Sequence, residues 1–578
     1  MKYIRYYLPI FVLALVIVFF IKPKRFFKRT KAKIETHYYH ATSEKPFVII
    51  IPSYNNEDIC ERNLLSVFNQ KYKNYRVIYI DDCSRDNTYA KVSKLINDLG
   101  QNHRVTLIKN EKNKGALENL YRAIHSCKEE EIVAIVDGDD FLSHDWVLEK
   151  LNCYYANPNI WLTYGSYLSY PQYTTGECSR RLPDAIFKKV SLRDYSKKHG
   201  MLTSHLRTFY AALFKKIKFQ DFLYKGNFFD STYDGAMMFP MIEMAGKEHI
   251  FFIKDKLYIY NRANPLNDDK VNFEKQQRCW RTILAMPPYQ KLDSLNFNRD
   301  EQETYRADLM VFSYDRPLQL YAYLESLESY VKNYDKVTVL YRSSREEYQA
   351  GYDEVIGSFP EVDFCKQGAD PKKDFQPILL KNVFREGSSE YIVFVVDDII
   401  IKDDIDLNVA IQEMKKRDAY GFYFRLGTHV DYCYMNGIKQ GIPLLIPFEN
   451  QVYAWCFEEG RGDWKYPHSL DMTLYKKSVI EEAFTSMEYV NPNSLEAAWA
   501  SCEPGNQIGL CYATSKIVNI PLGIVNPSTN RHMNLYSAEE LLTLFNQGLK
   551  IDIEPLHHIH NVSAHIEYHP MFVERTKQ

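Results

Sequence analysis

Short apolar runs that end in polar or acidic turns recur along this chain and restrict its fold more than any other feature. PFVIIIPSYNN, residues 46–56, has the continuous apolar character of a strand buried on both faces. RVIYIDDCSRDNT (76–88) repeats the pattern with an acidic turn, and RVTLIKN (104–110) and EIVAIVDGDD (131–140) follow. Segments with helical spacing of apolar residues lie between these runs, as in residues 57–72. The alternation predicts an α/β fold with a parallel sheet between helices.

Composition excludes several classes of function. The 578 residues are enough for two or three domains, and the apolar content of 46% and charged content of 25% are typical of a folded protein. A formal net charge of −2 gives no reason to expect nucleic acid as a partner. The 11 cysteines are scattered without a C-x-x-C pair, which indicates reduced thiols rather than a zinc site or a disulfide framework.

The N-terminus has the pattern of a membrane anchor. Residues 3–21, YIRYYLPIFVLALVIVFFI, carry one charge and approach the roughly 20 apolar residues that cross a bilayer. The basic flank KPKRFFKRTKAK (22–33) has no small-residue cleavage site, so residues 1–33 are predicted to be an uncleaved single-pass anchor. The positive-inside rule then places the rest of the chain in the cytoplasm. A helix lying in the membrane surface is the alternative, which Pro9 keeps open.

The acidic run VDGDD is the strongest chemical signal. Asp137, Asp139 and Asp140 lie within four positions at the end of a predicted strand, where ligands of open α/β sheets bind. Adjacent carboxylates raise one another's pKa unless a cation lies between them, and Mg²⁺ or Mn²⁺ prefers such oxygen ligands. The alternative is structural, because Asp139 or Asp140 could cap the helix predicted at SHDWVLEKL.

The ordered set of strand-PSYN, strand-DDCSRDNT, NKG with a helix, and strand-DGDD resembles the family 2 glycosyltransferases of the GT-A fold, over about residues 46–290. The resemblance implies a metal-dependent inverting transferase. It would move a sugar from a nucleotide-sugar donor, most often a UDP-sugar, to the hydroxyl group of a glycan or lipid-linked acceptor. A nucleotidyltransferase would require a Gly-rich loop after the first strand, and a dinucleotide oxidoreductase a G-x-G-x-x-G, and neither is present.

The same resemblance implies roles for individual residues. Asp82 would accept a hydrogen bond from the nucleobase. Asp139 and Asp140 would bind the metal, and Asp140 is the first candidate for a direct metal ligand. Asp234, in STYDGAMMFPMIEMAG, would be the general base. An N-cap role for Asp234 is compatible with that. The implied nucleotide-sugar-binding residues are Pro52, Tyr54, Asp82, Asp137, Asp139, His205 and Arg207.

From Ala307 the pattern begins again. ADLMVFSYDRP is similar to PFVIIIPSYNN, and Tyr54 precedes Asp82 by 28 residues just as Tyr314 precedes Arg342. The matching intervals predict a second, divergent GT-A-like domain over residues 305–578, in tandem with the first.

The second half departs from the first at its candidate site. Arg342 replaces the nucleobase aspartate and cannot accept a uracil N–H, while the acidic run is reduced to Asp397 and Asp398, with Glu496 the candidate base. Three alternatives stay open: a bifunctional transferase with a second donor, a glycan-binding scaffold, or a silent domain that braces the first.

Overall fold

The computed structural model describes residues 43–176, 180–188, 191–264, 272–297, 304–368, 370–502, 507–522, 535–557 and 559–575. The predicted anchor at residues 1–33 lies outside these ranges. Within them, no helix combines the length and the apolar character that crossing a bilayer requires.

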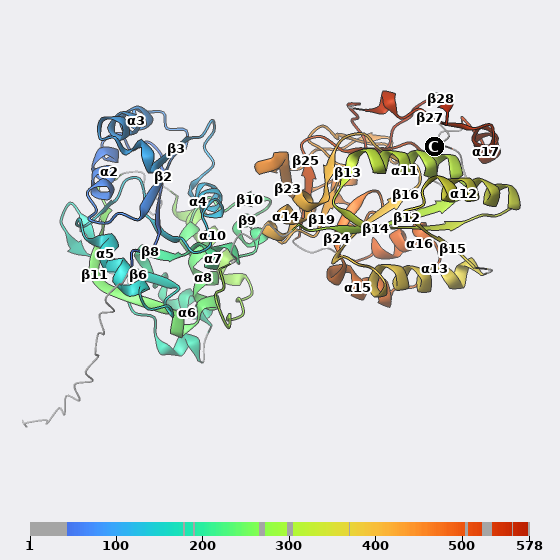
Figure 1. Ribbon diagram of the computed structural model, residues 1–578. Helices are drawn as coiled ribbons and strands as arrows, with labels where there is room; N and C mark the ends of the chain where they lie inside the picture. Colours follow the sequence, from blue (N-terminus) through green and yellow to red (C-terminus); the bar gives the residue numbers. More distant parts are fainter. Residues whose placement is uncertain are drawn as a thin grey trace, which may run out of the picture.

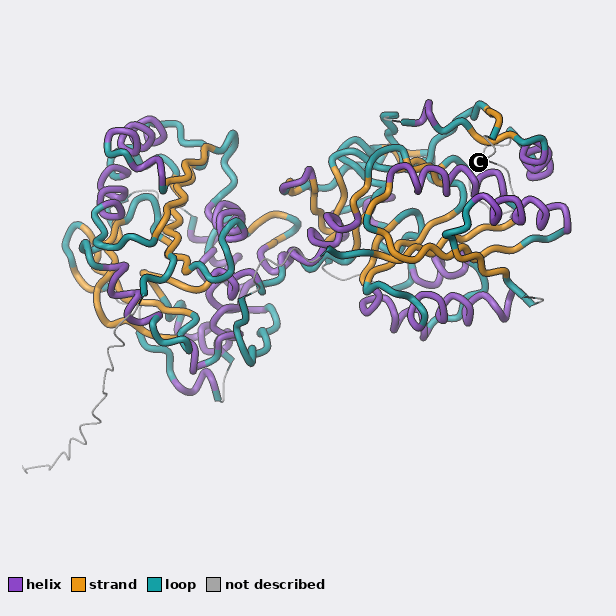
Figure 2. The backbone as a smooth tube through the Cα atoms, viewed as in Figure 1, coloured by secondary structure: helices purple, strands orange, loops and turns teal. Residues whose placement is uncertain are grey.

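The first half of the chain is built on one mixed sheet, which the sequence predicts correctly at its parallel edge (Figures 1 and 2). Its strand order is β3-β2-β1-β4-β8-β6-β11-β5. β1 pairs in parallel with β2 and β4, and β2 with β3, whereas β8 runs antiparallel to β4 and β6. The strands are β1 Phe47–Ser53, β2 Tyr75–Asp81, β3 Val105–Lys109, β4 Ile132–Ile135, β5 Phe141–Leu142, β6 Leu162–Tyr170, β8 Ser204–Tyr210 and β11 Ile250–Asn261.

Helices cover both faces of this sheet. The chain runs outward from β1 to β3 through α2 and α3, and then returns to β4, next to β1, through α4. Crossovers between parallel strands are right-handed, so reversing the direction of travel places α4 on the face opposite α2 and α3 (Figure 1). The helices are α2 Cys60–Phe68, α3 Thr88–Asp98, α4 Ala116–His125, α5 Val147–Tyr155, α6 Leu192–His199, α7 Ala211–Lys215, α8 Tyr233–Ala245 and α10 Phe273–Ala285.

The second half has its own sheet, in the order β15-β14-β12-β16-β24-β19-β25-β23-β22. Figure 1 shows α11 and α12 over one face and α13 and α15 over the other. The strands are β12 Ala307–Tyr314, β14 Tyr334–Arg342, β15 Asp363–Lys366, β16 Tyr391–Val396, β19 Gly421–Tyr423, β22 Ile446–Pro447, β23 Val452–Cys456, β24 Thr473–Lys476 and β25 Ile508–Tyr512. The helices are α11 Pro317–Tyr330, α12 Glu346–Ser358, α13 Pro371–Leu380, α14 Leu407–Arg417, α15 Lys477–Ser486, α16 Pro492–Trp499 and α17 Ala538–Asn546.

The two sheets correspond strand by strand. In each, three parallel pairings at one edge are followed by two antiparallel pairings, one parallel pairing and one antiparallel pairing. The central strands β1 and β12 are buried except for Tyr314 at the end of β12, as strands enclosed by helices must be.

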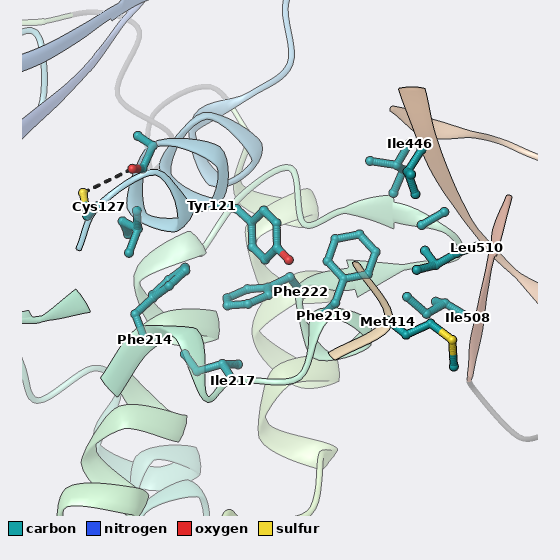
Figure 3. Close-up of a cluster of buried hydrophobic side chains, with 14 of the residues drawn as sticks. Tyr121, Cys127, Phe214, Ile217, Phe219, Phe222, Met414, Ile446, Ile508 and Leu510 are labelled. Atoms are coloured by element: carbon teal, nitrogen blue, oxygen red, sulfur yellow. Dashed lines mark hydrogen bonds between the residues drawn. The ribbon is translucent and has the colours of Figure 1, made fainter. Parts of the chain in front are cut away.

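An apolar contact joins the two halves around Phe448. Its ring centroid lies 5.5 Å from that of Phe219 and 6.3 Å from that of Tyr121, both in the first half. The guanidinium groups of Arg122 and Arg417, one from each half, lie 5.3 and 3.8 Å from its ring centroid. Figure 3 shows the same contact, with Tyr121, Phe219 and Phe222 facing Met414, Ile446, Ile508 and Leu510.

Candidate functional site

The acidic run VDGDD lies directly after β4, at the carboxyl edge of the first sheet. β1, β2 and β4 are parallel, so Pro52 near the end of β1 lies at the same edge as Asp82 and Asp137, which follow β2 and β4. Gly138 allows the turn to lie against β1, because a Cβ atom there would be 2.5 Å from the Cβ of Ser53. The sequence therefore brings its acidic turn onto the end of the central strand.

Asp137 contacts side chains from two other elements of the site. Its Oδ1 accepts a hydrogen bond of 2.7 Å from the Tyr233 hydroxyl, and its Oδ2 lies 3.3 Å from Nε2 of His205. The His205 ring stacks on Tyr258 with centroids 4.5 Å apart, which holds it beside Asp137. Burial raises the pKa of Asp137, but the hydrogen bond and charge of His205 and the charge of Arg207 outweigh burial and lower it below its ordinary value.

Asp139 and Asp140 differ in exposure. Asp140 is fully buried, and its carboxylate accepts hydrogen bonds from the Tyr258 hydroxyl at 2.7 Å and from the Asn261 amide at 2.6 Å. Asp139 is half-buried and accepts one from Asn264. Neither caps a helix, because α5 begins at Val147, so the structural alternative for this run is wrong.

The charges of the run are not balanced by the protein alone. Burial and then the charge of Asp137 raise the pKa of Asp139 to about 6, and burial with the charges of Asp139 and Asp137 raises that of Asp140 well above 3.8. A divalent cation would relieve this repulsion. Ligand atoms of Asp137, Asp140 and His205 lie within 4.8 Å of one another and could hold one, so a cation fits the run. In this grouping His205 takes the place that the sequence assigned to Asp139.

Arg207 and Asp234 lie beside this cluster. Both His205 and Arg207 are on the buried strand β8, and Arg207 Nη2 donates to Asp234 Oδ2 at 3.1 Å. Asp234 occupies the first turn of α8, where its Oδ1 accepts from the Gly235 amide, whereas Thr232 is the N-cap residue. The N-cap interpretation of Asp234 is therefore wrong. Its side chain is 25% exposed, so solvent or a substrate can reach it.

The predicted nucleobase residue, Asp82, is held by the loop before α4. Its carboxylate accepts hydrogen bonds from the amides of Lys114 and Gly115 and from the side chain of Asn110, at 2.7 to 2.9 Å. A carboxylate has about four acceptor positions, so one remains for a ligand. Pro52 is buried and Tyr54 is half-buried at the end of β1, on the same edge.

Sequence reasoning missed two tyrosines that hold the site together. Tyr233 precedes the predicted base, so its place beside Asp234 was a usable signal. Tyr258 donates to Asp140 and accepts from the Asp137 amide. It lies more than a hundred residues away in the chain, so the sequence contained no signal that it belongs to this site.

In the second half, Asp397, Asp398 and Glu496 line one cavity of about 790 Å³. Arg316 Nη1 donates to both aspartates, at 3.2 Å to Asp397 and 2.9 Å to Asp398. Glu496 lies on α16 and accepts from the Leu470 amide, and burial followed by the charge of Asp471 raises its pKa to about 8. The structure thus brings all three predicted residues together, but with an arginine between the acidic pair.

Comparison with known proteins finds similarities to the first half of the chain. Residues 48–219 match the family model described as glycosyl transferase family 2. Bifunctional glycosyltransferase pgtA of Dictyostelium discoideum is 30% identical over 190 residues, 30% of this chain and 24% of that protein. The Escherichia coli UDP-Glc:alpha-D-GlcNAc-diphosphoundecaprenol beta-1,3-glucosyltransferase WfgD is 33% identical over 122 residues, 21% of this chain and 44% of that protein. The chain spans less than half of the length of either relative.

Among solved structures, S. aureus TarS 1-349 in complex with UDP-GlcNAc is 21% identical, with a TM-score of 0.28 over 38% of this chain and 58% of that chain. The matched family region contains β1 to β8 and with them the acidic run, His205 and Arg207, while Asp234 lies just beyond it. The similarity to glycosyl transferase family 2 is therefore found over residues 48–219 of this longer chain.

Proposed function

We propose that the first half is a metal-dependent, inverting glycosyltransferase that moves a sugar from a nucleoside-diphosphate sugar to an acceptor hydroxyl. One observation carries the proposal: the acidic run and the candidate base belong to one connected site. Tyr233 donates to Asp137 while its neighbour Asp234 accepts from Arg207, so α8 fixes the base relative to the end of β4.

The base side of the reaction is assigned to Asp234. A carboxylate within hydrogen-bond reach of an acceptor hydroxyl takes its proton as the oxygen attacks the anomeric carbon. The bond from that carbon to the diphosphate breaks on the opposite face, so a single in-line displacement inverts the configuration. Arg207 Nη2 donates to Asp234 Oδ2 and so orients the side chain that this role requires.

The donor side is assigned to the acidic run and β8. Asp137, Asp139 and Asp140, with His205 beside them, would hold the cation, which when bound stabilises negative charge on the departing nucleoside diphosphate. Among the described residues, Arg207 Nε and Nη1 are buried without a hydrogen-bond partner, so this side chain retains donors for a substrate oxygen.

The relatives favour a UDP-sugar and a lipid-linked acceptor. The name of WfgD states a UDP-Glc donor and a diphosphoundecaprenol-linked acceptor. We extend that chemistry to this chain as a proposal, with a glycan as the other acceptor class. An N-terminal anchor at residues 1–33, with the catalytic half in the cytoplasm, would place the site near a lipid-linked substrate.

For the second half we propose a divergent GT-A-like domain. Its sheet repeats the order and strand directions of the first sheet, and its candidate residues share a cavity. The bifunctional name of pgtA favours two active sites in one chain over a glycan-binding or silent second domain.

The test is turnover of a panel of UDP-, GDP- and CDP-sugars by the full chain in detergent, with lipid-linked and soluble glycan acceptors. Reactions contain Mn²⁺, Mg²⁺ or EDTA, and nuclear magnetic resonance gives the anomeric configuration of the product. We expect metal-dependent transfer with inversion that is lost in Asp139→Asn and Asp234→Asn. Asp255→Asn is the matched control, because Asp255 is exposed and pairs only with Lys150 among the described residues.

Transfer that persists undiminished in EDTA would contradict the metal requirement. Retention of configuration would contradict the role of Asp234 as base. Binding of glycan without turnover of any donor would instead support a scaffold.

A further inference from the structure

The cavity of the second half lies at the carboxyl ends of its parallel strands. Tyr314, Arg342, Gln367 and Asp397 line it, and they lie at or just after the ends of β12, β14, β15 and β16. Ligands of open α/β sheets bind at this edge, and about 790 Å³ falls within the range of roughly 300–1,000 Å³ for small-molecule sites. The position and size therefore fit a ligand of nucleotide-sugar dimensions.

Arg316 occupies the position that Asn56 has in the first half. Each follows a residue with positive φ, Asp315 at 53° and Asn55 at 54°, at the end of the central strand. Asp315 accepts a hydrogen bond from the Ser344 amide in the next strand's turn, as Asn55 does from the Arg85 amide. The two turns share these features, and Asn56 and Arg316 stand at equivalent positions in them with different side chains.

That difference changes how each site balances its carboxylates. Arg316 places one guanidinium nitrogen within hydrogen-bond distance of both Asp397 and Asp398, and its side chain is only 10% exposed. Asn56 is neutral and donates to Ser53 instead. The acidic pair of the second half therefore has the positive charge of Arg316 between its members, whereas Asn56 brings no charge to the acidic run of the first half.

Two further cations of the cavity remain available to an anion. Arg342 lies over the Tyr314 ring at 5.2 Å, and neither it nor Lys372 pairs with a carboxylate of a described residue. Of the other charged groups in the lining, Arg425 donates to Asp463, and His565 lies 3.6 Å from Asp471. Arg342 and Lys372 are both exposed, which suits binding of phosphate oxygens at the cavity mouth.

We propose that this cavity binds a nucleoside-diphosphate sugar without a divalent cation. Arg316 replaces the ion at the strand-end carboxylates, and Arg342 and Lys372 contact the diphosphate. This binding mode is independent of the site in the first half, so the two can be tested separately in the same chain.

The test is isothermal titration calorimetry of the full chain in detergent with UDP, GDP and inorganic pyrophosphate, in EDTA and in Mn²⁺. Every sample carries the Asp139→Asn substitution, which we expect to weaken nucleotide binding at the site of the first half. We expect one nucleoside diphosphate to bind in EDTA with one site per chain, and more tightly than pyrophosphate. Loss of two charge-assisted contacts in Arg342→Gln/Lys372→Gln should weaken binding by at least about tenfold.

Matched controls lie next to the variants. Arg345→Gln/Lys373→Gln changes two exposed cations whose partners, Glu539 and Asp370, lie outside the cavity, and we expect its affinity to equal that of the parent. Binding that requires Mn²⁺, or that the Arg342→Gln/Lys372→Gln variant leaves unchanged, overturns the proposal. Pyrophosphate binding as tight as that of every nucleotide points to a simple phosphate site and also overturns it.

Discussion

The acidic turns of the two halves occupy equivalent places in two sheets of similar topology, but the charges of their carboxylates are balanced differently. Ile50 of β1 pairs with Ile135 of β4, and Asp139 lies four residues after Ile135. The equivalent residue of β12, Met310, pairs with Phe394 of β16, and Asp398 lies four residues after Phe394. In the first half the carboxylates repel each other, and the pKa of Asp139 is raised to about 6 by burial and Asp137. In the second, Arg316 joins Asp397 and Asp398.

The difference teaches that one scaffold can supply the positive charge in two ways. A site with unbalanced carboxylates needs a cation from solution, and its occupancy then depends on metal concentration. In a site with a built-in arginine, the positive charge is always present and does not depend on the metal concentration. The substitution of one residue in the turn after the central strand, Asn56 or Arg316, separates the two.

The largest expected effect is on catalysis in the first half. Asp234→Asn removes the proposed base while keeping an acceptor for Arg207, and we expect the rate of sugar transfer to fall by about 10²–10⁴-fold. Steady-state kinetics with the preferred donor measures this. Metal-free nucleotide binding in the second half should not change.

Asp230→Asn is the matched control for that variant. Asp230 is exposed, lies four residues earlier and pairs with Lys275 rather than with the acidic run. An unchanged rate in Asp234→Asn would show that α8 does not supply the base.

The next largest effect is on stability in the second half. Arg316→Asn places the asparagine of the first half in this turn and leaves the buried Asp397 and the half-buried Asp398 without their cation. Removing one partner of a buried ion pair costs about 3–5 kcal/mol, so we expect a lower unfolding temperature in EDTA. Mn²⁺ should restore part of it by binding the two carboxylates that have lost their cation, since an ion at 100 times its Kd stabilises by about 2.7 kcal/mol. Differential scanning calorimetry measures both effects.

Arg345→Asn controls for loss of charge near the same edge. Its surface ion pair with Glu539 is half exposed, and we expect a change of less than about 1 kcal/mol. An Arg316→Asn protein that is as stable as wild type, or indifferent to Mn²⁺, would remove the distinction between the two turns.

Much of the fold follows from local sequence. The apolar runs at β1, β2 and β4 are nearly continuous and end in turns, so these strands can be recognised within each segment. The same continuity places Asp137 and Asp397 at a sheet edge, because both follow a buried parallel strand directly. The acidic runs could therefore be located without a structure.

The rest depends on contacts between distant segments. Tyr258 reaches Asp140 from β11, and Arg316 reaches Asp398 from the turn after β12, and no local pattern marks either approach. Arg316 was visible in SYDRP, but its direction toward the acidic pair is set by the tertiary arrangement of β12 and β16. The sequence located the carboxylates and left open how their charge is balanced.

A smaller effect concerns the contact between the halves. Phe448→Ala removes the ring that packs on Tyr121 and Phe219, and we expect a loss of about 2–4 kcal/mol in coupling, somewhat below a fully buried truncation. Calorimetry should then resolve two transitions, with Phe273→Ala, whose side chain is 62% exposed, as the control. A single transition at the wild-type temperature would show that the two sites do not depend on this contact.

The most gradual effect is the pH dependence of stability that Glu496 contributes in the second half. Burial and then Asp471 raise the pKa of Glu496 to about 8, so the folded protein keeps a proton there that the unfolded chain releases near pH 4.5. Stability must therefore fall as pH rises between these values, by up to about 1.4 kcal/mol per unit, and level off above pH 8. Glu496→Gln should flatten the fall in unfolding temperature between pH 5.5 and 8, whereas the exposed Glu482→Gln should not. A profile unchanged in Glu496→Gln would mean that Glu496 is ionised at neutral pH and is available as a base in the second site.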